Sequence, residues 1–222
     1  MTRPVYGLLV DRGVIDRALR QQLEDRRVGE RLMERIALAY LWGDEELDSP
    51  RLAYLFETAQ VEALDDATGW FWSIRDQQLS GGKVERILEF WDRCVSWSRT
   101  AGEPPVRLLS SLSRLSCYLH SITEREQNML LSVAPYVKVG YNDDFFLEEL
   151  DRLVEANAAE VSIVMKAFLD SHVPDNDFED KLKALLTKLA EHGKRDEAIA
   201  FADRLRHLPG MIQLYTNLIS RS

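Results

Sequence analysis

Mostly apolar residues in the second half of this 222-residue chain recur at a fixed spacing of 35 residues. Five positions of one predicted helix pair return at this spacing in the next two pairs. These sets are Leu112, Leu147 and Leu182; Leu115, Leu150 and Leu185; Leu119, Val154 and Leu189; Met129, Val164 and Ile199; and Ser132, Ala167 and Ala202. Stacked helix pairs produce such a step, because each pair buries the same positions against its neighbours.

A spacing of 35 residues is close to about ten turns of an α-helix, so two amphipathic helices can match at this offset by chance. One offset that holds for both helices of a pair, across three pairs, favours a repeat. The series of Val133 and Phe168 breaks at Asp203. The pattern predicts an all-α fold, a right-handed α-solenoid-like stack of antiparallel helix pairs with about 11–12 helices.

The first half of the chain is also predicted to be helical, because no segment shows the strict polar–apolar alternation of a half-buried strand. Helices are expected at residues 14–24, 29–42 and 50–59, the last opened by a serine cap and a proline. A break is expected from Asp65 to Gly69, before the aromatic stretch that runs from Trp70 to Ile74.

The segment from Lys83 to Arg99 is the most apolar predicted helix, and it carries apolar residues on two sides. The following Ala101–Pro105 segment, rich in Gly and Pro, predicts a boundary. We therefore expect a Trp-rich helical subdomain at residues 1–102 and a helical-repeat subdomain at residues 103–222, packed as one unit.

The predicted repeat subdomain consists of three helix pairs of about 35 residues each and a terminal helix. Pro135 is expected to kink or end its helix, and Gly193 to stop another. The predicted pairs are 106–120 with 124–139, 144–155 with 158–172, and 178–192 with 196–208, followed by a terminal helix at 211–219.

Composition indicates a soluble protein, with 45% hydrophobic and 29% charged residues. No apolar run approaches the ~20 residues that span a bilayer, and the N-terminus does not resemble a signal peptide. The two cysteines, Cys94 and Cys117, lie in apolar helical segments. They predict reduced, buried thiols and a cytoplasmic location, with no membrane partner.

Acidic residues are concentrated between Asn142 and Asp180, a segment that contains twelve acidic residues and only two basic ones. The net charge of this stretch is −10 and that of the whole chain is −9, so the remaining residues have a net charge of +1. A solvated outer face and an acidic strip that meets a basic protein are both open interpretations. Nucleic acid is a disfavoured partner. The candidate partner-binding residues of the strip are Glu148, Glu149, Asp151 and Glu155.

The tryptophans of the first half have two interpretations: large core residues, or exposed anchors for a partner. Trp72 and Arg75 are candidate partner-binding residues, because arginines lie close to the tryptophans in sequence. An enzyme site around Trp72, Arg75, Arg86 and Trp91 is the competing hypothesis, and it requires a deep pocket with converging polar groups.

No motif with catalytic, cofactor-binding or metal-binding spacing stands out. The chain lacks a phosphate-binding loop, Cys-x-x-Cys and His-Glu-x-x-His. His120, His172, His192 and His207 lie near predicted helix C-termini, where a cation interacts favourably with the helix dipole. His172 and His207 are 35 residues apart and are expected to be equivalent. We predict no catalytic residue, no cofactor and no metal.

The third pair resembles a degenerate tetratricopeptide repeat, with Gly193 at the end of the first helix and Ala198 near the start of the second. Leu182 and Leu189 occupy the family's aromatic positions, and Ala202 a packing position that is usually aromatic. The resemblance covers about 35 residues well and about 100 loosely, and HEAT-like pairs are nearly as similar. It implies protein–protein interaction on a concave surface, without a cofactor.

The overall pattern also loosely resembles the helical C-terminal regions of large bacterial NTPase-type and defence proteins. We therefore predict a non-enzymatic helical-repeat scaffold that mediates protein–protein interaction. The alternatives are a regulatory or assembly domain of a larger bacterial complex, and an enzyme with a site between the two helical halves. The sequence does not give the partner or the oligomeric state.

Overall fold

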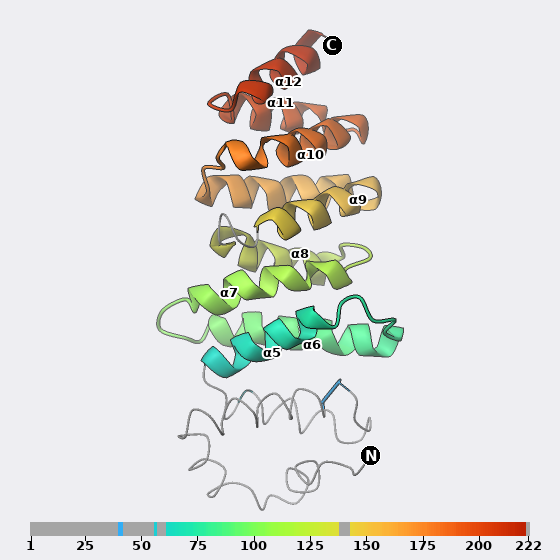
Figure 1. Ribbon diagram of the computed structural model, residues 1–222, viewed down its shortest axis with the longest axis vertical. Helices are drawn as coiled ribbons and strands as arrows, with labels where there is room; N and C mark the ends of the chain where they lie inside the picture. The colour runs from blue at the N-terminus through green and yellow to red at the C-terminus, as the bar shows by residue number, and fades with distance from the viewer. Residues whose placement is uncertain (1–39, 42–55, 57–60, 138–142, 221–222) are drawn as a thin grey trace, which may run out of the picture. The chain divides into compact units, whose positions relative to one another are not determined.

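A computed structural model describes residues 40–41, 56, 61–137 and 143–220. The elements over these residues are α-helices and short 3₁₀ helices, with no strand among them, as the all-α prediction requires (Figure 1). The three N-terminal helices expected before residue 60 lie outside the described residues, apart from the buried helical residues Tyr40 and Leu41 and the single residue Phe56.

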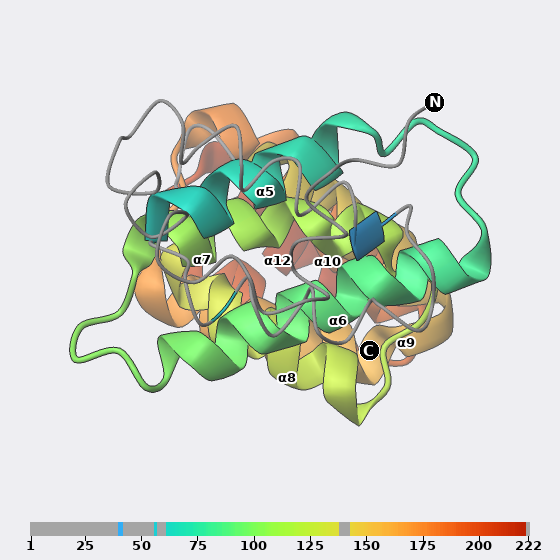
Figure 2. The same cartoon turned by 90° about the horizontal axis from the view of Figure 1, so that it is seen from below.

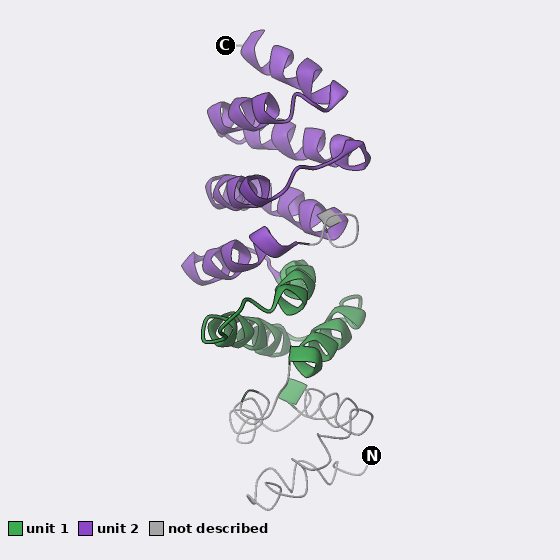
Figure 3. Cartoon of the chain, turned by 90° about the vertical axis from the view of Figure 1, so that its left-hand side faces the viewer, with its two compact units in different colours: residues 1–118 green, residues 119–222 purple. Residues whose placement is uncertain are grey.

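The chain divides into two compact units, coloured separately in Figure 3. Unit 1 comprises residues 1–118 and unit 2 comprises residues 119–222. The boundary expected from the Gly- and Pro-rich segment lies at residues 102/103, whereas the compact units divide after Tyr118.

Unit 1 contains four described elements: α5 (Val61–Ser73), α6 (Gly81–Ser98), α7 (Val106–Leu112) and the 3₁₀ helix η1 (Ser113–Tyr118). Helix α5 contacts α7, next to which it is drawn in Figure 2. Both α5 and α6 also contact η1. The rings of Phe71 and Phe90 meet edge-on at 4.9 Å between centroids, and both are fully buried. The Tyr118 hydroxyl donates to the Phe71 carbonyl at 2.6 Å, so aromatic packing joins α5, α6 and η1.

Helix α5 corrects the break predicted at 65–69, because it continues through those residues. Asp65 is 7% exposed and pairs with Arg107 of α7 at 2.6 Å. The Thr68 hydroxyl donates to the Leu64 carbonyl at 2.8 Å. Polar residues that favour a loop when solvated are here satisfied inside the helix, which keeps its regular backbone.

Helix α6 confirms the predicted helix at 83–99, with apolar residues buried on more than one side. Its fully buried side chains include Ile87, Phe90, Trp91 and Cys94. Ser80 precedes the helix in an extended conformation, which is usual for an N-cap residue.

Unit 2 contains α8 (Glu124–Val133), η2 (Ala134–Tyr136), α9 (Asp143–Ser171), η3 (Asn176–Phe178), α10 (Glu179–Glu191), α11 (Arg195–Arg204) and α12 (Pro209–Ser220). Along the chain, α8 contacts α9, α9 contacts α10, α10 contacts α11, and α11 contacts α12. Helix α10 also contacts α12, so α9, α10 and α12 form one row of neighbours within the unit. Figure 3 shows these helices in successive layers.

The second predicted pair, 144–155 with 158–172, is present as two helical segments within α9. They meet at Asn157, whose φ of −140° and ψ of 42° are not helical. The third pair corresponds to α10 and α11. Pro135 has the predicted effect, because α8 ends at Val133 and the chain continues as a 3₁₀ turn.

Gly193 ends the α10 segment with a φ of +83°, a conformation that favours glycine. The amide of Lys194 then donates to the Leu189 carbonyl at 2.9 Å, which satisfies one of the last carbonyls of α10. The predicted helix stop is therefore confirmed.

Most positions of the 35-residue series are buried in unit 2. Leu147, Leu150 and Val154 of α9, like Leu182, Leu185 and Leu189 of α10, are at most 1% exposed. In the second helices, Val164 and Ala202 are buried, whereas Ala167 and Ile199 are partly exposed. No described helix combines the length and the apolarity that a membrane span requires.

Candidate functional site

Long basic side chains connect neighbouring segments of unit 2 by donating to backbone carbonyls. Arg152 of α9 donates to the Leu119 carbonyl at 2.6 Å, and Lys188 of α10 donates to the Asp151 carbonyl at 2.7 Å. Arg195 of α11 donates through Nε to the Leu218 carbonyl at 3.2 Å. Arg204 of α11 also donates to the Leu169 carbonyl. Several of these acceptors lie near a helix C-terminus, where carbonyls lack intrahelical donors and attract cations.

The Asn157 side chain connects two turns that are 35 residues apart. Its Oδ1 accepts from the Ile122 amide at 3.1 Å, and its Nδ2 donates to the Ile122 carbonyl at 3.3 Å. One carboxamide thus satisfies both backbone groups of a residue that is 5% exposed. The bond joins the turn between the α9 segments to the turn that precedes α8.

Three of the four acidic candidate residues form ion pairs within unit 2. Glu148 pairs with Lys181 at 2.8 Å, Asp151 with Lys188 at 3.2 Å, and Glu149 with Arg152 at 2.7 Å. These pairs hold α10 against α9, or lie within α9. Glu155 is exposed, as is Glu148. Three of the four candidate carboxylates are therefore paired with nearby lysine and arginine side chains.

Lys181 contacts two carboxylates, since it also donates to Asp144 at 2.6 Å. Partial burial disfavours the ammonium charge, but the hydrogen bonds that Lys181 donates to Asp144 and Glu148, with the charges of these carboxylates, outweigh it and raise the pKa of Lys181 above its usual value. The ammonium group is thus firmly cationic at neutral pH and acts as a structural counter-ion.

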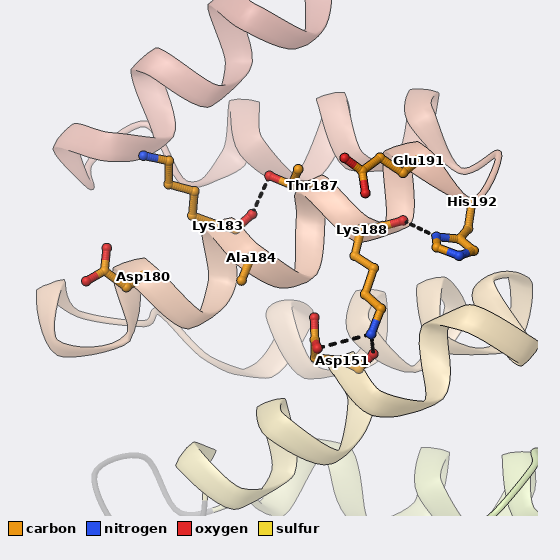
Figure 4. Close-up of a pocket in the computed structure, with 8 residues that line it drawn as sticks. All are labelled: Asp151, Asp180, Lys183, Ala184, Thr187, Lys188, Glu191 and His192. Atoms are coloured by element: carbon orange, nitrogen blue, oxygen red, sulfur yellow. Dashed lines mark hydrogen bonds and ion pairs between the residues drawn. The ribbon is translucent and has the colours of Figure 1, made fainter.

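An open groove of about 570 Å³ lies along α10 and reaches Asp151 of α9 (Figure 4). Its α10 side consists of residues spaced at helical intervals, so they share one face of that helix. The residues that line it are Asp151, Asp180, Lys183, Ala184, Thr187, Lys188, Glu191 and His192.

Small residues and the Asp151–Lys188 ion pair line the middle of the groove, and further charged residues lie at its ends. Ala184 and Thr187 form the middle of the α10 face, and the Thr187 hydroxyl donates to the Lys183 carbonyl at 2.7 Å. Exposed Asp180 and Glu191 are eleven residues apart, which is about 16 Å along a helix. An open surface with small central residues and charged ends fits a segment of another protein better than an enclosed small molecule.

Sequence reasoning missed most of this groove, because it selected residues by local charge density. Asp180, Lys183, Thr187 and Glu191 are polar or charged residues spaced three and four apart opposite the apolar face of α10. That spacing is visible in the sequence, but it is the pattern of any solvated helix face. Only the fold shows that α9 borders this face and makes a groove.

Trp72 and Arg75, the other predicted site residues, are close together in unit 1. The Arg75 guanidinium lies 4.0 Å from the Trp72 ring centroid, and that of Arg114 lies 5.2 Å from it. Both arginines are within cation–π range of the partly exposed ring. Arg75 also pairs with Asp76 at 3.7 Å.

The other two residues of the enzyme hypothesis have structural surroundings. Arg86 donates to the carbonyls of Tyr40 and Leu41 at 3.4 Å and 3.1 Å. Trp91 is fully buried, and its indole Nε1 has no hydrogen-bond partner among the described residues. A buried indole and a guanidinium that binds backbone carbonyls do not supply the converging polar groups that this hypothesis requires.

Three of the histidines bind carbonyl oxygens. His172 and His192 each place Nδ1 2.9 Å from the carbonyl four residues earlier. His207 instead places Nε2 2.9 Å from the Pro174 carbonyl, so the predicted equivalence of His172 and His207 is wrong. The difference arises because α9 ends directly before His172, whereas a turn separates α11 from His207. The described residues contain no cluster of three or more His, Cys, Asp or Glu that could hold a metal.

The two cysteines are not joined by a disulfide, and their surroundings differ. Cys94 is completely buried in α6, and burial raises the pKa of its thiol well above the usual value. Cys117 is only partly buried, which corrects the prediction that both thiols are buried.

Comparison with known proteins adds no relative. No model of a known protein family, no curated protein and no solved structure matches the chain.

Proposed function

We propose that this chain is a non-enzymatic helical-repeat scaffold, and that the groove between α9 and α10 holds a segment of another protein. The groove residues Ala184 and Thr187, between Asp180 and Glu191, carry this proposal. In this account unit 2 is part of a right-handed α-solenoid, similar to tetratricopeptide or HEAT-like repeats. The first segment of α9 and helix α10 are then the first helices of two successive pairs, and α12 is the terminal helix that follows them.

The side-chain bonds between helices support a stacked architecture. Asn157 connects two turns at the spacing of the repeat, and Arg204 donates to a carbonyl 35 residues earlier. Such bonds position each pair against only its neighbours, which is the arrangement of repeat proteins. A rigid row of helices offers an extended surface that a flexible partner segment can follow.

The charge distribution supports the groove over the predicted acidic strip as the contact surface. Glu148 and Asp151 already contact lysines of α10, so a partner that bound these carboxylates would have to break those ion pairs, whereas a segment in the groove can leave the Asp151–Lys188 pair intact in the groove wall. Asp180 and Glu191 are exposed at the two ends of the groove. Small central residues let a partner backbone approach closely, while charged ends favour one register.

Binding measurements with groove variants test the proposal. A protein that copurifies with the tagged chain is identified, and its affinity is measured by isothermal titration calorimetry. Thr187→Arg fills the centre of the groove, and Glu191→Lys reverses one end. We expect each variant to weaken binding by about tenfold or more, equivalent to about 1.4 kcal/mol.

Matched control variants carry the same changes elsewhere in unit 2. Ile163→Arg adds an arginine at an exposed position of α9, and Glu160→Lys reverses a charge near it. Both should leave the affinity unchanged. Affinities that stay within twofold for all four variants would show that the groove is not the binding site.

A further inference from the structure

Helix α12 differs from the other described α-helices in carrying no charged residue in its 12 positions. Met211, Leu214 and Leu218 are buried on one side, and α12 contacts both α10 and α11. Two large apolar side chains are nevertheless exposed: Ile212 at 53% and Ile219 at 44%. They are seven residues apart and therefore share one face of the helix.

The burial patterns of α10 and α12 show which way this exposed face is turned. The buried Leu182, Leu185 and Leu189 of α10 match the buried residues of α12 at a spacing of 29. At this spacing, Ile212, Tyr215 and Ile219 correspond to Lys183, Leu186 and Ala190 of α10.

A further 35 residues earlier, these positions correspond to Glu148, Asp151 and Glu155 of α9. Glu148 and Asp151 contact Lys181 and Lys188, so in α9 this face is turned toward the next helix of the row. We call Ile212, Tyr215 and Ile219 the α12 end face. This face of α12 is equivalent to the face of α9 that contacts α10, and both of its isoleucines are exposed.

The surroundings of the α12 end face are close to neutral. The Arg206 guanidinium lies 3.9 Å from the Tyr215 ring centroid, and it pairs with Asp203 at 2.6 Å. Unit 2 as a whole has eighteen acidic and twelve basic residues, a net charge of −6. Two copies that approach through acidic surfaces repel each other, whereas the uncharged α12 end faces do not.

We propose that the α12 end face pairs with the same face of a second copy of this chain, in antiparallel orientation about a two-fold axis. With the axis near Tyr215, Ile212 of each copy contacts Ile219 of the other, and the reverse. The same uncharged patch serves both partners, as a two-fold interface requires. The pairing involves neither the α9–α10 groove nor the function proposed for it.

The size of the α12 end face sets the strength of the pairing. A 12-residue helix is about 18 Å long, and a single helix face per copy buries less than the ~1,200 Å² of a typical stable interface. The dimer is therefore weak, with a dissociation constant on the order of 100 μM.

Sedimentation equilibrium of the full chain, from about 5 to 500 μM, tests this pairing across the expected dissociation constant. The weight-average mass of the wild-type chain should rise from one copy toward two. Apolar contacts are not screened by salt, so raising the NaCl concentration should leave the association as strong or strengthen it.

Two variants separate the α12 end face from other routes to association. The double variant Ile212→Asp with Ile219→Asp should remain a monomer at every concentration, with an unchanged far-UV circular dichroism spectrum. Ile163→Asp places the same charge at an isoleucine of α9 that is 49% exposed, and it should associate like the wild type. The proposal would be overturned if the wild-type chain stayed monomeric, or if the double variant associated as well as the wild type.

Discussion

Replacing Asn157 with alanine removes both hydrogen bonds that its carboxamide makes to the backbone of Ile122. The amide and carbonyl of Ile122 then lose their partner beside a side chain that is 5% exposed. A net hydrogen bond is worth about 0.5–1.5 kcal/mol, and an unsatisfied buried group costs about 1–3 kcal/mol. Because Asn157 is partly exposed, water replaces some of the loss, and we expect a destabilisation of about 2 kcal/mol.

Urea unfolding followed by far-UV circular dichroism measures this loss. All five tryptophans lie in unit 1, so their fluorescence follows that unit separately. Amide hydrogen exchange gives a local measurement, because the Ile122 amide should exchange faster once its acceptor is gone. Asn157→Asp keeps an acceptor for that amide and loses the donor to the carbonyl, so it should lose stability yet keep the amide protected.

Asn128→Ala is the control, because Asn128 is exposed on α8. It should change the free energy of unfolding by less than about 0.5 kcal/mol. If Asn157→Ala changed the free energy of unfolding as little as this control, and the Ile122 amide exchanged at the wild-type rate, the connection between the two turns would not contribute to the stability of the fold.

Three further predictions concern pH, backbone strain and thiol reactivity. Hydrogen bonds from Lys166 and Arg204 lower the pKa of Asp170, so its contribution is present at neutral pH and lost as pH falls through about 4 and below. Asp170→Asn should therefore reduce the change in urea midpoint between about pH 6 and 3. Gly193→Ala places a Cβ at a φ of +83° and should cost about 1 kcal/mol in thermal or urea unfolding, whereas a silent substitution would contradict the left-handed turn. Because burial raises the pKa of the Cys94 thiol, that thiol should react with a disulfide reagent at least about 100-fold more slowly in native than in unfolded protein, and equal rates would place it at the surface.

The helix pairs of unit 2 could be predicted because local residues mark their ends. Pro135 and Gly193 act through their own backbone restrictions, which require no knowledge of neighbours. The buried series of α9 and α10 follows from helical periodicity in the same way. The continuous helix α5 could not be predicted, because Asp65 is satisfied by Arg107, a residue far away in sequence.

The candidate site was harder to predict, because exposure depends on pairing between helices. Glu148 and Asp151 form part of an acidic run in the sequence, but the fold places Lys181 and Lys188 against them. The groove needs both α10 and the neighbouring Asp151 of α9, and no local pattern gives that neighbour. Trp72 and Arg75 could be predicted as a pair of neighbours, because they are only three residues apart in the sequence.

The central claim is that the α9–α10 groove binds a protein segment, and site-specific photo-crosslinking tests it most directly. A photoreactive phenylalanine replaces Thr187 in the groove, or Ile163 on α9 as the control, and each chain is irradiated in cell extract. We predict that the Thr187 variant forms a discrete adduct with one protein, that Glu191→Lys reduces the adduct, and that the Ile163 variant forms none. Adducts that are absent at Thr187, or equally abundant at both positions, would contradict the proposed scaffold function of the groove.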